Sequence, residues 1–261
     1  MQKSGTGRRS DAVVLPLLAA ASGAVDALAF IALGHVFAGV MTGNLILMAI
    51  GFGSGSPGDA AFPLAALAGF SLAVRGGGWF CRSEGRRGRR IEGAPGPSPA
   101  SRPGPGLSPA SRPGPGLGPG TGAARSGWTL RVYACLAVEV VLLASVGVVW
   151  AAVGGHPDGA GRGALIAVLS VAMGLQTAAM LAAGPAGAPT TYFTGTLSSL
   201  LTHPAGGGRA GARLAALVAG AVCAAALRTW APAWAALPPP LLAVAALSLA
   251  LPVRRPNERL L

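Results

Sequence analysis

Two carboxyl groups lie inside stretches of sequence that are otherwise apolar. Asp26 falls within LPLLAAASGAVDALAFIALG, and Glu139 falls within the apolar stretch 128–153. A carboxylate in hydrocarbon is costly unless it is protonated, paired or hydrated, so an intramembrane acid is by default a candidate functional residue. We therefore interpret Asp26 and Glu139 as candidate ion or proton sites. In the alternative interpretation, each carboxyl group is protonated or hydrogen-bonded and only fixes the packing of helices.

Two Thr-Gly motifs form the second candidate site. Met41-Thr42-Gly43-Asn44 and Phe193-Thr194-Gly195-Thr196 combine hydroxyl and amide groups with a glycine that permits close approach of backbones. If both segments turn back inside a membrane, their polar tips could frame a small polar site near its midplane. The alternative is that the small residues simply pack helices tightly. The predicted substrate-binding residues are Asp26, Thr42, Gly43, Asn44, Gln176, Thr194, Gly195 and Thr196.

The composition places these residues in a multi-pass helical membrane protein. Hydrophobic residues make up 52% of the chain and charged residues only 11%, whereas soluble proteins carry about 25% charged residues. The net charge of +12 comes from basic residues that flank the apolar stretches, as in cytoplasmic loops. We expect contacts with the lipid bilayer and with anionic headgroups at the basic loops, and none with nucleic acid. The spacing of the cysteines predicts no metal site, and we expect no cofactor.

Hydropathy and charge divide the chain into spans, two unusual short segments and basic connections. The loop 82–127 is rich in Pro, Gly and Arg and repeats SPASRPGPGL at 98–107 and 108–117, which predicts a disordered linker. The segments 36–53 and 188–202 are too short or too polar for ordinary spans, which need about 20 apolar residues. The predicted segments are a basic tail 1–11; a first part 12–81, with spans 12–34 and 60–81 around 36–53; the loop 82–127; a span 128–153; a second half 162–253, with spans 162–183, 209–230 and 235–253 around 188–202; and a basic tail 254–261.

The two halves resemble each other, and their charges favour one topology. If 36–53 and 188–202 are re-entrant segments or half-helices, both tails and the arginine-rich loop lie on the cytoplasmic side. Each half then has three spans, so the second half is inverted relative to the first, as in many transporters. We therefore predict six transmembrane helices and two short segments, with cytoplasmic termini. The corresponding landmarks are Gly23 with Gly174, Thr42 with Thr194, and Gly69 with Gly220.

Some residues near the span ends are expected to act as anchors at the membrane surface. Arg75 and Arg228 are expected to extend toward the nearer membrane face, or to pair with the buried acids. Tryptophan is enriched at membrane interfaces. The five tryptophans expected there are Trp79, Trp128, Trp150, Trp230 and Trp234.

The chain resembles the YoaK family of bacterial multi-pass membrane proteins of unknown function. The match covers nearly the whole chain apart from the tails and the Pro/Gly-rich loop. It implies a protein of the bacterial plasma membrane but supplies no substrate or mechanism. The residues that carry the resemblance are Ser22-Gly23, Asp26, Met41-Thr42-Gly43-Asn44, Gly174-Leu175-Gln176, Thr190-Thr191 and Thr194-Gly195-Thr196.

These features leave several classes of function open. The inverted repeat, the Thr-Gly motifs and Asp26 favour a secondary transporter or channel for a small solute or ion. The long basic loop is also compatible with a non-catalytic membrane scaffold or a stress-related protein. A membrane-embedded enzyme is less favoured, because the sequence has no Ser/His pair, metal-spaced His or Glu cluster, or HExxH motif.

Overall fold

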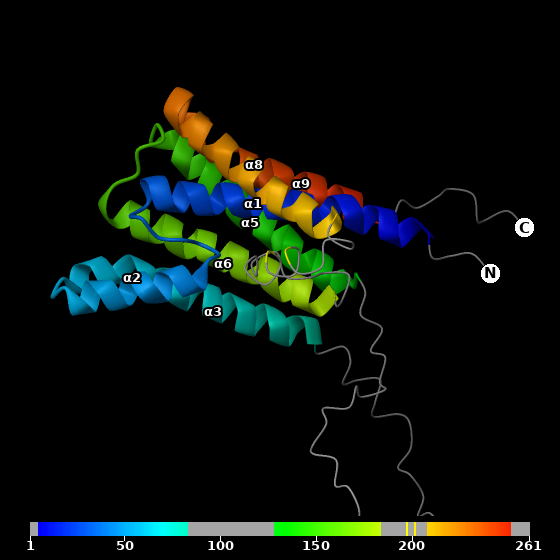
Figure 1. Ribbon diagram of the computed structural model, residues 1–261, viewed down its shortest axis with the longest axis horizontal. Helices are drawn as coiled ribbons and strands as arrows, with labels where there is room; N and C mark the ends of the chain where they lie inside the picture. Colours follow the sequence, from blue (N-terminus) through cyan, green and yellow to red (C-terminus); the bar gives the residue numbers. More distant parts are fainter. Residues whose placement is uncertain (1–4, 83–127, 184–196, 198–200, 202–207, 252–261) are drawn as a thin grey trace, which may run out of the picture.

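The computed structural model describes residues 5–82, 128–183, 197, 201 and 208–251, and within them the regular structure is helical, with no strand. Six helical stretches are long and apolar enough to cross a membrane, and α2 is a shorter apolar helix. The predicted all-helical membrane protein with six spans is confirmed. The elements are α1 (Gly5–Ala32), α2 (Met41–Gly53), the 3-10 turn η1 (Pro57–Ala60), α3 (Ala61–Arg82), α5 (Leu130–Ala152), α6 (Gly159–Ala183), α8 (Gly208–Trp230), the 3-10 turn η3 (Pro232–Trp234) and α9 (Pro238–Ala250) (Figure 1).

Two helix boundaries differ from those expected. Helix α1 begins at Gly5 and therefore extends into the stretch predicted to be a basic tail. The last span was expected over 235–253, but α9 starts at Pro238 and ends at Ala250, after the short turn η3. Proline lacks a backbone N–H and has a helical φ, so it suits the first turn of a helix. The three prolines at 238–240 thus set the start of α9.

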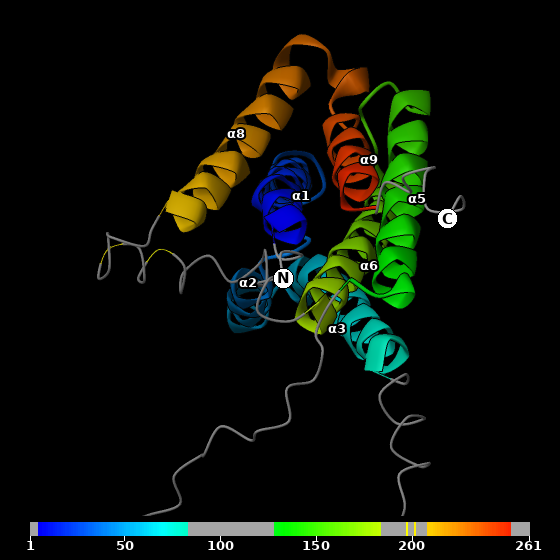
Figure 2. The same ribbon diagram turned by 90° about the vertical axis from the view of Figure 1, so that its right-hand side faces the viewer.

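The first helix of each half packs on the other half. Helix α1 packs mainly on α8 and α9, whereas α6 packs mainly on α3 and α5. Below we call α1, α8 and α9 the α1 group, and α6, α3 and α5 the α6 group. Figure 2 shows both groups in a view turned by 90° from that of Figure 1. The colours of Figure 1 show that α1 and α6 run in opposite directions. The two halves are therefore inverted relative to each other and interlocked through their first helices.

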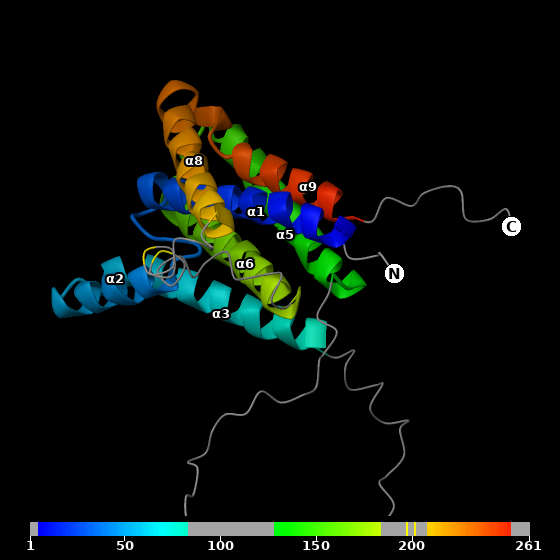
Figure 3. The same cartoon turned by 45° about the vertical axis from the view of Figure 1, so that its right-hand side comes forward.

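Glycines allow the closest helix crossings within each group. Helix α8 crosses α1 in Figure 3, and a Cβ added at Gly220 would collide with the backbone of Ala20. On the partner helix, a Cβ at Gly23 would collide with the carbonyl of Leu217. In the α6 group, a Cβ at Gly174 would lie 2.6 Å from the carbonyl oxygen of Phe70 on α3. Both groups therefore depend on glycine for direct backbone contact, as is common between membrane helices.

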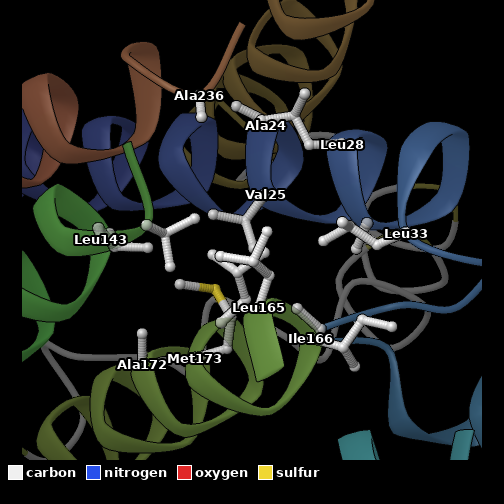
Figure 4. Packing of buried hydrophobic residues seen from close by; sticks show 14 of the residues in the cluster. Ala24, Val25, Leu28, Leu33, Leu143, Leu165, Ile166, Ala172, Met173 and Ala236 are labelled. Carbon is white, nitrogen blue, oxygen red and sulfur yellow. The ribbon is translucent and has the colours of Figure 1, made fainter. Parts of the chain in front are cut away.

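The interior consists of two separate apolar clusters. The larger, which we call the upper cluster, includes Val25, Leu143 and Met173 and is drawn in Figure 4. The smaller, which we call the lower cluster, includes Leu18, Leu136 and Met180. Each cluster takes side chains from α1, α5, α6 and α9. These helices come from both groups, so the two clusters form the contact between the α1 group and the α6 group.

The two cysteines at the adjoining ends of α3 and α5 provide a direct test of this packing. The Sγ atoms of Cys81 and Cys135 lie 3.6 Å apart. A disulfide needs an S–S distance of about 2.05 Å, which a small movement of the side chains achieves. We expect copper-phenanthroline to join these two thiols and to leave Cys223 on α8 as a free thiol, so that after denaturation in SDS only Cys223 reacts with maleimide. Replacing either Cys81 or Cys135 by Ser should restore maleimide labelling at the other; undiminished labelling of both in the parent protein would contradict the packing.

Candidate functional site

The chain reverses direction directly after α1. Gly34 and His35 have positive φ angles of 110° and 59°, and glycine adopts such angles far more easily than other residues. The following residues run back along α1, so that the amides of Ala38 and Gly39 each donate a hydrogen bond of 2.8 Å to Oδ1 of Asp26. Helix α2 then runs outward in the same direction as α1 (Figure 1). The segment predicted to be re-entrant therefore consists of an extended stretch that runs back along α1 and a short helix, α2, that runs in the same direction as α1.

Asn44 holds the same extended stretch from the other side. Its Oδ1 accepts a hydrogen bond of 2.9 Å from the amide of Phe37, and its Nδ2 donates one of 2.6 Å to the carbonyl of Phe37. Asn44 is fully buried and Asp26 is 9% exposed. Non-helical backbone at membrane depth is tolerated only where its polar groups are satisfied. We call Asp26, Asn44 and the backbone of 37–39 the loop clamp.

Gly39 is a member of the loop clamp that the sequence interpretation missed. A Cβ at this position would lie 3.2 Å from Oδ2 of Asp26 and 3.6 Å from Oγ of Ser22. A side chain here would press directly on the carboxylate. The available signal was a glycine three residues before Thr42, but the fold was needed to pair it with Asp26.

The first Thr-Gly motif is divided between different surroundings. Asn44 points inward, whereas Thr42 is exposed. A Cβ at Gly43 would lie 2.9 Å from the ring of Phe37, so this glycine makes room for the loop. Thr194, Gly195 and Thr196 lie outside the described residues, as does nearly all of 188–202. The structure thus brings Asp26, Gly43 and Asn44 together around 36–40, in contacts that hold the protein's own backbone.

A second polar region separates the two apolar clusters. Glu139 lies on α5 between Leu136 of the lower cluster and Leu143 of the upper one. It is fully buried, and neither of its carboxyl oxygens has a hydrogen-bond partner among the residues that the structure describes. Buried polar groups normally have partners, and a buried carboxyl group without one calls for an explanation. We call Glu139, Gln176 and Thr177 the polar layer.

Gln176 connects the polar layer across the two groups of helices. It is fully buried on α6, and its Nε2 donates a hydrogen bond of 3.2 Å to the carbonyl of Leu18 on α1. Thr177, beside it, bonds the carbonyl of Met173 within its own helix at 2.9 Å. The polar layer therefore lies where the α1 group meets the α6 group. Gln176 lies on the same inter-cluster level as Glu139. Its predicted association with the second Thr-Gly motif stays a prediction, because Thr194, Gly195 and Thr196 lie outside the described residues.

One tryptophan differs from the expected interfacial role. Trp150 is only 1% exposed, and its Nε1 donates a hydrogen bond of 2.7 Å to the carbonyl of Pro232. It joins the end of α5 to η3 inside the protein, so its prediction as a lipid anchor is wrong. Trp79, Trp230 and Trp234 are 72%, 85% and 58% exposed, as an anchor requires.

The two polar regions differ in what their carboxyl groups are able to do. Asp26 uses Oδ1 to satisfy two backbone amides, so its first role is to hold the reversal between α1 and α2. Glu139 makes no such hydrogen bond to any residue in the described ranges. A carboxyl group of this kind can hold a proton, or can ligate a cation once the surrounding helices admit one. Glu139 and the polar layer are therefore the stronger candidate site.

Comparison with known proteins agrees with this architecture. A family described as "Protein of unknown function (DUF1275)" matches residues 14–93 and 120–249. The chain is also 28% identical over 194 residues to the UPF0700 transmembrane protein YoaK of Bacillus subtilis (strain 168), an alignment that covers 74% of this chain and 67% of the relative. The resemblance to the YoaK family is thereby confirmed. No solved structure matches the chain.

Proposed function

The chain belongs to the DUF1275 family of proteins of unknown function, and we propose that it is a secondary transporter. Its cargo is a small solute or ion, and its path lies between the α1 group and the α6 group. The observation that carries the proposal is Glu139, a fully buried carboxyl group whose two oxygens have no hydrogen-bond partner within the described part of the chain. Burial of a polar group without a partner costs free energy, and a role in holding a proton or an ion would account for such a group between two apolar clusters.

The arrangement of the repeats supports a transport cycle. In many transporters, inverted repeats rock against each other around a site near the membrane midplane. Here the α1 group and the α6 group meet through the clusters on either side of the polar layer. Opening of the contact at the upper cluster would admit water to Glu139 from one side, and opening at the lower cluster would admit it from the other. Glu139 then takes up a proton or cation on one side and releases it on the other.

The loop clamp has a separate part in this proposal. Asp26 and Asn44 keep the extended stretch and α2 attached to α1. In our proposal this unit closes one end of the path as a rigid plug, and the carboxylate of Asp26 stays bound to backbone amides during transport. Thr42, exposed at the start of α2, is then available to contact the solute as it enters.

The proposal also includes a location and an orientation. The chain lies in the bacterial plasma membrane with both termini in the cytoplasm, since the basic segments next to the spans are favoured on that side. Those segments contact anionic lipid headgroups. We assign the protein no catalytic reaction.

Transport through the polar layer predicts a specific loss on removing the charge of Glu139. We expect Glu139→Gln to lower proton or Na⁺ flux into proteoliposomes by about tenfold or more, because the amide cannot exchange a proton. Proton flux is read with a pH-sensitive dye inside the vesicles and Na⁺ flux with a Na⁺-selective dye, both under an imposed membrane potential. Glu139→Asp should retain part of the flux. Asp158→Asn, which alters an exposed acid outside the spans, is the matched control and should leave flux unchanged.

A hydrophobic carbodiimide provides an independent readout. Such reagents react with protonated carboxyl groups in apolar surroundings, so Glu139 should acquire the label and Glu139→Gln should not. A labelled Glu139 whose Gln variant shows undiminished flux would contradict the proposal. So would a parent protein that conducts neither protons nor Na⁺ and carries no label, and the scaffold interpretation would then be preferred.

A further inference from the structure

A groove of about 380 Å³ lies between α3 and α6. Phe70, Val74 and Arg75 line it from α3, and Leu181 and Ala182 line it from α6. Among the described residues that line the groove, one is an arginine and none is an acid, and the remaining surface is largely apolar. Ser71 lies one helical turn from Arg75 on the same side of α3 and also lines the groove. The groove thus combines one cation and a hydroxyl group with an apolar channel.

The groove lies near one end of the bundle. Leu181 and Ala182 belong to the last turn of α6. Arg75 precedes the end of α3 by about two helical turns, a rise of about 10 Å. Trp79 lies one turn beyond Arg75 and is 72% exposed, as expected where a helix reaches the membrane surface. An arginine at this depth can extend its guanidinium to the level of lipid headgroups.

The chemistry of the groove fits one kind of molecule. A guanidinium binds phosphate by paired, charge-assisted hydrogen bonds, and the Ser71 hydroxyl can donate another. Phe70, Val74 and Leu181 offer the apolar surface that an acyl chain needs. We propose that the groove is a binding site for an anionic phospholipid, with its phosphate at Arg75 and one acyl chain along α3 and α6. This site is independent of the transport proposal, because none of its residues belongs to the polar layer.

Competition between two lipids tests the proposal on the full-length protein. We expect native mass spectrometry, with equal amounts of phosphatidylglycerol and phosphatidylcholine, to show preferential retention of phosphatidylglycerol. Arg75→Gln should lower that preference about fivefold or more, by removing the charge-assisted bonds. Ala182→Phe, which keeps the charge but fills the groove, should lower lipid retention as well. Arg162→Gln changes an exposed arginine at the opposite end of α6 and should have no effect.

Photocrosslinking identifies the occupant of the groove directly. Benzoylphenylalanine in place of Leu181 should form an adduct with phosphatidylglycerol, and Arg75→Gln should reduce its yield. An adduct with residues 184–207 of the same chain, or with a second copy, would overturn the proposal. An unchanged lipid preference in Arg75→Gln would also overturn it, provided that the variant elutes and melts like the parent protein.

Discussion

Gly220→Ala is expected to destabilise the folded protein by about 1–3 kcal/mol, even though alanine favours helices more than glycine does. The added Cβ would collide with the carbonyl group and Cα of Ala20, which are backbone atoms of α1 and cannot rotate away. Helices α1 and α8 would have to separate, and close contacts along the whole crossing would be lost. SDS titration of the purified protein, followed by tryptophan fluorescence, measures the change in unfolding free energy.

The same helix provides the matched control for this prediction. Gly211 lies in α8, but a Cβ there meets no atom within 4 Å, so Gly211→Ala should be neutral or slightly stabilising. Gly23→Ala should resemble Gly220→Ala, because its Cβ would meet the carbonyl of Leu217 in the same crossing. The double variant should cost less than the sum of the singles, since one separation relieves both collisions. Equal stability of the Gly220→Ala and Gly211→Ala variants would show that the helices do not cross so closely.

These glycines illustrate which parts of the fold are predictable from the sequence. The alignment of Gly23 with Gly174, and of Gly69 with Gly220, predicts related positions in two halves. It does not predict that Gly23 meets α8 and Gly174 meets α3, so that each first helix packs on the other half. Hydropathy identifies the helices that cross a membrane, because a helix surrounded by lipid must be apolar. Which helices pack against each other depends on how their surfaces fit together, and a single sequence does not show that fit.

The candidate site follows the same division. Asp26 and Glu139 are predictable as unusual residues, because a carboxyl group stands out in an apolar span. The two acids differ in their hydrogen bonds, and this difference depends on the backbone. Ala38 and Gly39 reach Asp26 only because the chain reverses at Gly34 and His35. No sequence pattern identifies a backbone amide as the hydrogen-bond partner of a buried carboxyl group. Trp150 was misjudged for a related reason, since its position near a helix end indicated lipid contact, whereas η3 covers it.

The loop clamp carries the second large prediction: Asp26→Ala should destabilise the protein by about 2–5 kcal/mol. The substitution leaves the amides of Ala38 and Gly39 without their acceptor, in surroundings that exclude water. Asp26→Asn keeps an acceptor oxygen at the same place and should cost about 1 kcal/mol, the difference between a charged and a neutral acceptor. Hydrogen exchange at the Ala38 and Gly39 amides, with SDS titration for the global stability, measures both effects.

A second pair of variants separates the loop clamp from a general loss of fold. Asn44→Ala removes both hydrogen bonds to Phe37, so it should speed exchange at Phe37. Thr42→Ala changes an exposed residue of the same helix and should not. If Ala38 and Gly39 exchange as slowly in Asp26→Ala as in the parent protein, the carboxylate does not hold the loop. If Asp26→Asn instead preserves slow exchange but abolishes transport, the charge of Asp26 acts on the solute as well as on the backbone. The exchange rates at three neighbouring amides therefore decide whether the acid in the first span is a structural clamp, a transport residue, or both.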